Sequence, residues 1–434
     1  MTPERGICAQ ANFPDLRADH CPRIMSVEML PDASRIGSQT VSTHVESHAR
    51  GRSMRRLILP AFHRTLVPVS TMLLAGLVGC ASLTGPARPA ECSVPDATAP
   101  RSVIVEVPEV YELANIILAL TQYQALAPHT VWSGPYLTQV RSHFDSLRNH
   151  PLIAALNARL TSGGSWNYDA YYGFRENSFV YQFGSTGLTH VTGYTRAWGG
   201  TDLFSQEIRR VEDFANRSGF RAFYADHASF YADQIRRYQD LVSVDRMWRW
   251  LETRFPDRYD RYRIVFSPLI NGSHSTQRFT TAGVRETVMF IAGPDVLRDT
   301  SDARLRTAQL ERLVFTEIDH NYVNPATNRY EGVVRRIFSD VSAWNGDVNN
   351  YRSPVATFNE YMTWAVFNLY AREAYDPATA AAIRENVIRS MLGRRFGKFR
   401  EFEQQVMDVY LAAGSQPCVP NLYGAILGRA AALR

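Results

Sequence analysis

The residues whose types and spacing suit chemistry lie in the segment TEIDHNYVNP, residues 316–325. Glu317 and His320 have the spacing of the glutamate and the second histidine of HExxH. In that motif two histidines one helical turn apart hold zinc, and the glutamate acts as general base. The first position of the motif is occupied here by Thr316. The segment therefore predicts a metal site that lacks one of its usual imidazoles.

A second acidic residue, Glu360, lies among large apolar residues in the segment FNEYMTWA, residues 358–365. A carboxylate in such surroundings needs a partner. In zinc hydrolases a separate segment can supply a glutamate ligand, while the glutamate of the motif activates water. We therefore expect His320 and Glu360 to be metal ligands and Glu317 to be the catalytic base. Alternatively, Glu360 is an ordinary surface carboxylate or pairs with Arg372.

One long helix is expected to carry the motif, from about residue 301 to residue 324. Ser301 and Asp302 can cap its start, and Pro325 is expected to end it soon after Asn324. At 100° per residue, a polar stripe forms along one side of this helix and faces a cleft. The stripe consists of Glu317, His320, Asn321 and Asn324.

The elements around this helix predict an α+β fold that is mostly helical. Residues 262–269 and 287–291 are β-branched and aromatic runs bounded by Gly, Asn and Pro, which predicts two strands just before the long helix. Apolar residues at helical spacing predict helices elsewhere. These helices are expected near Val110–Leu120 and over residues 137–160, 204–216, 225–255, 357–371 and 377–412.

Composition excludes two classes of protein. With 45% hydrophobic residues in 434, the chain can bury a full core, so it is not intrinsically disordered as a whole. Nine of the 47 basic and six of the 42 acidic residues precede residue 80, which leaves 38 basic and 36 acidic residues after it. Because these charges nearly balance, the sequence predicts no strongly basic surface. We therefore expect no nucleic-acid partner.

The start of the chain predicts an exported lipoprotein. Residues 54–79 combine the basic stretch Met54-Arg55-Arg56 with a short apolar run, and they end in the lipobox LVGC at Cys80. Cleavage before Cys80 and lipidation of its thiol would anchor the chain to a bacterial membrane, and Ala81 favours the outer membrane. The alternatives are an uncleaved apolar anchor or cleavage near Ala90.

The predicted domain boundaries follow from this leader. Residues 1–53 show no sustained periodicity and are expected to be untranslated or disordered, and residues 80–102 are expected to form a tether. The globular domain then covers residues 103–434. Cys92 and Cys418, near its two ends, are expected to form a disulfide in the oxidising periplasm, with two unrelated thiols as the alternative.

From about Val103 to Ala371 the chain resembles an uncharacterised family of zincin-like metallopeptidases of bacterial envelopes, catalogued as a domain of unknown function. The motif of that family reads approximately HExxHxxxNP. The resemblance lies in Glu317, His320, Asn324-Pro325 and the segment NEY at residues 359–361, with weaker support from EVYEL at residues 109–113. It implies a gluzincin-like fold with zinc held by two helical histidines and a downstream glutamate.

Thr316 departs from the family pattern, and three outcomes stay open. His274, in the loop before the second strand, can replace the lost imidazole; Glu317 can itself become a ligand for a harder metal than zinc; or no metal binds. Thr316, Asn321 and Asn324 would surround the ligands. The expected function is a metal-dependent hydrolase acting on peptides or proteins in the envelope. The alternative is a non-catalytic binding or scaffold lipoprotein with the same fold.

Overall fold

The computed structural model describes residues 89–93, 101–123, 131, 133–161, 167–296, 302–347 and 351–433. The predicted leader, the lipobox cysteine Cys80 and residues 1–53 lie outside this part of the chain, as does most of the tether. Among the described residues, no helix combines the length and the apolar character that a membrane crossing requires.

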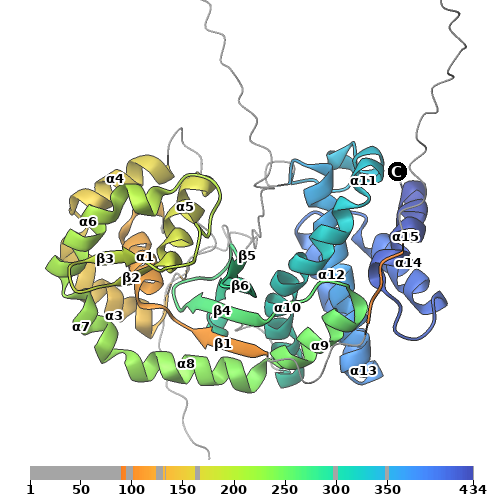
Figure 1. The fold of residues 1–434 in the computed structure, drawn as a ribbon, viewed down its shortest axis with the longest axis horizontal. Helices are drawn as coiled ribbons and strands as arrows, with labels where there is room; N and C mark the ends of the chain where they lie inside the picture. Colours follow the sequence, from red (N-terminus) through yellow and green to blue (C-terminus); the bar gives the residue numbers. More distant parts are fainter. Residues whose placement is uncertain are drawn as a thin grey trace, which may run out of the picture. The chain divides into compact units, whose positions relative to one another are not determined.

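A mixed four-stranded sheet lies at the centre of the described residues, with the strand order β1-β4-β6-β5 (Figure 1). Its strands are β1 Ser102–Glu106, β4 Arg261–Ser267, β5 Ser275–Thr281 and β6 Val284–Ala292. β1, β4 and β6 run parallel to one another, whereas β5 pairs antiparallel with β6 at the edge. A parallel sheet needs cover on both faces.

Both faces of the sheet are buried because apolar side chains alternate along its inner strands. Val265 of β4 and Phe290 of β6 belong to the apolar cluster on one face, together with Tyr111. Ile264 and Met289 belong to the main core on the other face. The two faces therefore pack into different apolar clusters.

Helices and a short hairpin formed by residues before β4 make up the N-terminal group. They are α1 Glu109–Leu120, α3 Pro135–Phe144, α4 Pro151–Leu160, α5 Tyr168–Arg175, β2 Tyr181–Phe183, β3 Leu188–His190, α6 Leu203–Ser218, α7 Phe220–Asp226, α8 Ala228–Leu241 and α9 Val244–Arg254. Tyr111 of α1 contacts Phe290 of the sheet, with ring centroids 5.5 Å apart.

The C-terminal group of helices begins directly after the sheet. It comprises α10 Ala303–Asn328, α11 Glu331–Ile337, α12 Pro354–Ala374, α13 Pro377–Gly393, α14 Phe399–Ala412 and α15 Tyr423–Ala430. In Figure 1, α10 lies between the sheet and α12. It contacts β5 and β6 on one side and α12 on the other, so α10 joins the sheet to the helices that follow.

The α+β class, with many helices and a small sheet before the long helix, agrees with the prediction. Four strands were missed: β1, at the predicted boundary between tether and domain, the short hairpin strands β2 and β3, and β5, which has the polar sequence STQRFTT. The helical pattern predicted over residues 137–160 corresponds to two helices, α3 and α4. Proline lacks the N–H that a continuing helix requires, and Pro151 starts a new one.

The prediction that Pro325 ends the long helix is wrong, because α10 continues through it to Asn328. A proline inside a helix leaves the carbonyl four residues earlier without its N–H partner. That carbonyl belongs to Asn321, and the hydroxyl of Tyr259 donates a hydrogen bond to it at 3.1 Å. Tyr259 thereby replaces the missing backbone donor.

Candidate functional site

α10 carries the central residues of the candidate site. The carboxylate of Asp302 accepts hydrogen bonds from the backbone N–H of Arg304 at 2.8 Å and of Leu305 at 3.3 Å. These bonds satisfy N–H groups that lack partners at a helix start. The sequence had assigned this capping role to Ser301 and Asp302. Residues 308–323 of the helix are almost entirely buried, so the predicted polar stripe faces other elements of the protein.

His320 and Glu360 lie side by side between α10 and α12. The Nε2 atom of His320 is 3.4 Å from Oε1 of Glu360, and the two residues are only 4% and 3% exposed. This separation is longer than the 2.7–3.2 Å usual for a hydrogen bond between nitrogen and oxygen. The structure thus brings together, in a buried ion-pair contact, the two residues that the sequence predicted as ligands.

Asn324 orients the imidazole of His320. Its Oδ1 atom lies 3.3 Å from Nδ1 of His320, one helical turn earlier. When Nδ1 carries the proton and donates to Asn324, the lone pair of the neutral ring is on Nε2. That lone pair is on the nitrogen nearer to Glu360.

The other oxygen of Glu360 binds Arg394, which follows α13. The Nη2 atom of Arg394 is 2.9 Å from Oε2 of Glu360 and also donates to the hydroxyl of Tyr351. The guanidinium lies 4.8 Å from the ring centroid of Trp364. Arg372, the partner considered from the sequence, is exposed. It lies twelve residues further along α12, about 18 Å away at 1.5 Å per residue.

Thr316 occupies the place of the missing histidine without taking its role. Its hydroxyl donates to the backbone carbonyl of Arg312 at 2.9 Å, one turn earlier in α10. A threonine hydroxyl is also a poor zinc ligand beside an imidazole. Thr316 therefore stabilises its own helix in this conformation.

Asn321 lies on the side of α10 that faces the sheet. The side-chain amide of Asn321 donates to the hydroxyls of Thr276 in β5, at 2.7 Å, and Thr287 in β6. Glu317 precedes Asn321 by one turn and is 2% exposed. His274, one residue before β5, is similarly buried at 3%. The polar stripe thus divides, with Asn321 bound to the sheet and His320 facing α12.

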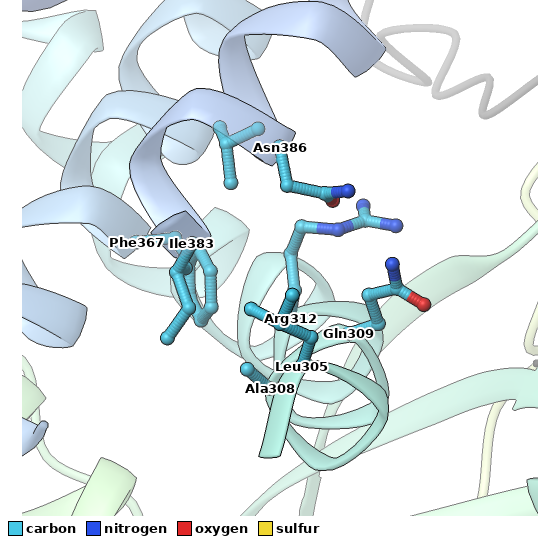
Figure 2. A pocket seen from close by; sticks show the side chains of 8 residues that line it. Leu305, Ala308, Gln309, Arg312, Phe367, Ile383 and Asn386 are labelled. Carbon is cyan, nitrogen blue, oxygen red and sulfur yellow. The ribbon is translucent and has the colours of Figure 1, made fainter. Parts of the chain in front are cut away.

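Two arginines beside the site were missed from the sequence. The guanidinium of Arg312 lies 4.2 Å from the ring centroid of Trp364, and Arg394 packs against the same ring. Figure 2 shows Arg312 beside Gln309 and Asn386 at a small hollow between α10 and α13. The hollow has a volume of about 10 Å³, room for about one water. Nothing in the spacing of Glu360, on α12, and Arg394, just after α13, could have indicated their contact.

The donor set of the site can be tested against a zinc ion. Two ligands at about 2.0–2.2 Å from a tetrahedral zinc are about 3.3–3.6 Å apart. The 3.4 Å between Nε2 of His320 and Oε1 of Glu360 fits that range. Among the described residues, no three His, Cys, Asp or Glu side chains are grouped as a ready-made metal site. The pair therefore fits two positions of a metal site, and further donors would have to move in.

Cys92 and Cys418 form a disulfide, with their Cα atoms 5.5 Å apart. The backbone N–H and carbonyl of Ala90 also bind the side chain of Asn421, at 2.7 and 2.9 Å. Arg258 donates to the carbonyl of Ser93 at 2.9 Å. The described end of the tether is therefore attached to the C-terminal helices through both covalent and polar contacts.

Comparison of the chain with protein-family models, with curated proteins and with solved structures gave no match.

Proposed function

We propose that this chain is a metal-dependent hydrolase of the bacterial cell envelope that cleaves peptide bonds. The 3.4 Å separation of His320 Nε2 and Glu360 Oε1 carries the proposal. Two lone-pair donors on neighbouring helices, at the spacing of two zinc ligands, suit a shared divalent ion. Glu317 lies one turn before His320 on the same helix.

The chain's own residues would divide the work as follows. His320 and Glu360 would hold the metal, Asn324 would orient His320, and Arg394 would orient Glu360. A divalent metal supplies Lewis acidity, which lowers the pKa of water and polarises a carbonyl. Glu317 would accept the proton of the attacking water and return it to the leaving amine.

The arrangement of α10 and the sheet also supports a zincin-like fold. The helix with the motif packs under a mixed sheet whose antiparallel edge strand is β5. An edge strand has backbone groups without a neighbouring strand, and an extended peptide can pair with them. We propose this edge as the substrate side of the site.

A non-catalytic binding protein is the second candidate, and Arg394 favours it. Its guanidinium is already a cation on Glu360, and the hydroxyl of Thr316 bonds to its own helix. If no metal binds, His320 and Glu360 form an ion pair that stabilises the α10–α12 contact. A protein of this kind would act through its surface and not through this site.

The Glu317→Gln variant tests the hydrolase directly. We expect it to keep its metal and to lose at least about 100-fold in peptide hydrolysis, because the amide cannot accept a proton. Glu331→Gln, on α11, is the matched control and should retain full activity. Loss of metal in Glu317→Gln would instead make Glu317 a ligand. Unchanged hydrolysis in that variant would refute its role as base.

We further propose that the protein is anchored in the outer membrane through lipidated Cys80. Radioactive palmitate should label the wild-type protein but not Cys80→Ala. Equal labelling of the two would contradict the anchor.

A further inference from the structure

His274 is a buried imidazole on the short loop before β5, and the roles assigned above do not use it. His274 is 3% exposed. The hydroxyl of Thr316 is bonded to its own helix, so Thr316 offers no ligand to the site. The inference about His274 rests on the proposed metal site. Three observations locate its side chain: the face of β5 on which it lies, its level along α10, and the fixation of its loop.

The alternation of side chains along β5 indicates that residue 274 lies on the face of the sheet that packs against α10. Ser275 and Gln277 both donate to Glu176, which lies on the side of the N-terminal helices. Thr276 accepts a hydrogen bond from Asn321 of α10. Because successive side chains of a strand point to opposite faces, we expect residue 274, which directly precedes β5, to share the face of Thr276.

The register of the sheet agrees with this assignment. Ser275 pairs with Phe290, and Thr276 pairs with Met289. Continued by one residue beyond the strand, this register puts His274 opposite Ile291. Met289 and Ile291 belong to the core on the α10 side of the sheet, whereas Phe290 belongs to the other cluster.

The direction of α10 sets the level of His274 along the helix. Tyr322 meets Tyr262 at the start of β4, and Asn321 meets Thr287 near the start of β6. The earlier residue Glu311 accepts a hydrogen bond from the backbone N–H of Ser243, which lies between α8 and α9. α8 in turn contacts the end of β6, because its Tyr238 donates to the carbonyl of Ala292. α10 therefore runs opposite to β6 and in the same direction as β5.

His274 is consequently level with the turn of Glu317. Moving two residues back from Thr276 along β5 covers about 6.8 Å. Moving four residues back from Asn321 along α10 covers about 6 Å. Since Thr276 and Asn321 are in contact, the two displacements bring His274 beside Glu317, one turn before His320.

The loop is fixed in a conformation that an L-residue rarely adopts. Ser273 has φ of 58°, in the left-handed region. Its carbonyl accepts a hydrogen bond from Arg175 at 2.7 Å, and Arg175 also pairs with Glu176 at 3.2 Å. Both charged residues are fully buried. Such strain persists only where the surrounding structure enforces it, and it is concentrated at functional sites.

From these observations we propose that His274 supplies the imidazole that Thr316 lacks, as the third protein ligand of the metal held by His320 and Glu360. In this arrangement the second imidazole comes from the segment just before β5 and not from the helix of the motif. The donor set is still two imidazoles and one carboxylate. Arg175 acts as a positioning residue, because it fixes the backbone from which His274 projects.

The test measures zinc affinity by calorimetry and cobalt(II) coordination by absorption on the purified full chain. His274→Ala should weaken zinc binding by at least about 100-fold. His143→Ala, an α3 histidine that contacts the carbonyl of Ser218, is the matched control and should bind zinc like the wild type. Adding Thr316→His to His274→Ala should restore tight binding, since the imidazole returns on the helix.

Two results separate the inference from the proposed function. If the wild-type protein binds neither zinc nor cobalt, both fail. If the wild type binds metal and His274→Ala binds it equally well, only the role of His274 is overturned. Thermal unfolding of His274→Ala and of the milder His274→Asn identifies any loss that comes from misfolding. If His274→Ala is misfolded, the metal affinity of His274→Asn, which keeps a polar side chain, tests the role of His274 in its place.

Discussion

Two buried carboxylates along the contact between α10 and α12 differ in how their oxygens are used. Glu311 of α10 receives Arg246 on both oxygens, at 2.9 and 3.2 Å, and its Oε2 also accepts from the hydroxyl of Tyr375. Glu360 of α12 receives Arg394 on one oxygen at 2.9 Å and presents the other to His320 at 3.4 Å.

This difference separates a structural carboxylate from one that can bind a ligand. Donors surround Glu311, so it can do little except stabilise the fold. Glu360 is equally buried, yet one of its oxygens faces Nε2 of His320 at 3.4 Å, and a cation between them is the arrangement that we propose. A buried acidic residue alone therefore says little, and the chemistry of its partners decides what it can do.

The largest expected effect comes from Arg394→Met. Removing one partner of a buried ion pair costs about 4 kcal/mol because the other charge stays buried. We expect the free energy of unfolding to fall by about this amount in the presence of a chelator. Saturating zinc should recover much of the loss, because the ion would neutralise the Glu360 carboxylate that the substitution leaves unpaired. Urea unfolding with and without zinc measures both, and a loss that zinc does not reduce would contradict the role given to Glu360.

Glu311→Ala should destabilise the protein by about 3 kcal/mol, because the hydroxyl of Tyr375 and the guanidinium of Arg246 lose their acceptor. Arg246 is partly exposed, and its return to water limits the cost. In contrast to Arg394→Met, this loss should be independent of zinc. The same urea experiment checks it, and a zinc-dependent loss would remove the distinction between the two carboxylates.

A third buried carboxylate, Glu112, has a hydroxyl group as its hydrogen-bond partner. It accepts a hydrogen bond from Tyr136 at 2.6 Å, and burial raises its pKa to about 7. The folded state holds this proton more tightly than the unfolded state, whose pKa is 4.5. Its contribution to stability is therefore full below pH 4.5 and falls by about 3 kcal/mol as pH rises to 7.

Glu112→Gln should abolish that part of the pH dependence, because an amide does not titrate. Urea unfolding of wild type and variant between pH 4.5 and 8 checks this. Parallel pH profiles for the two proteins would show that Glu112 is not the responsible group.

The smallest expected effect belongs to Asn324→Ala. Without the acceptor at 3.3 Å from Nδ1, His320 is less firmly held in the tautomer with its lone pair on Nε2. Zinc affinity should fall about 10-fold with little change in stability. An unchanged affinity would mean that packing alone orients the ring.

Local patterns predicted the helix of the motif and the proximity of His320 and Glu360. The spacing of Glu317 and His320 and the apolar surroundings of Glu360 are visible in the sequence. The continuation of α10 through Pro325 was missed because it depends on Tyr259, which lies far away in the chain and donates to the exposed carbonyl. β5 was missed because an edge strand that contacts polar residues of α10 and α5 does not alternate between apolar and polar residues.

Arg394 could not be predicted for a similar reason. It follows α13, and its contact with Glu360 depends on how α12 and α13 pack. Tertiary packing of this kind leaves no periodic signal in the sequence. Pairing patterns are readable only within one helix, where residues three or four apart face each other.

The most direct test is the metal content of the purified full chain after exposure to zinc and gel filtration, compared for wild type, Glu360→Gln and Glu311→Gln. The account predicts about one zinc per wild-type chain, about one in Glu311→Gln, and a loss of most of it in Glu360→Gln. Equal zinc in all three proteins, or none in the wild type, would contradict the claim that His320 and Glu360 form a metal site.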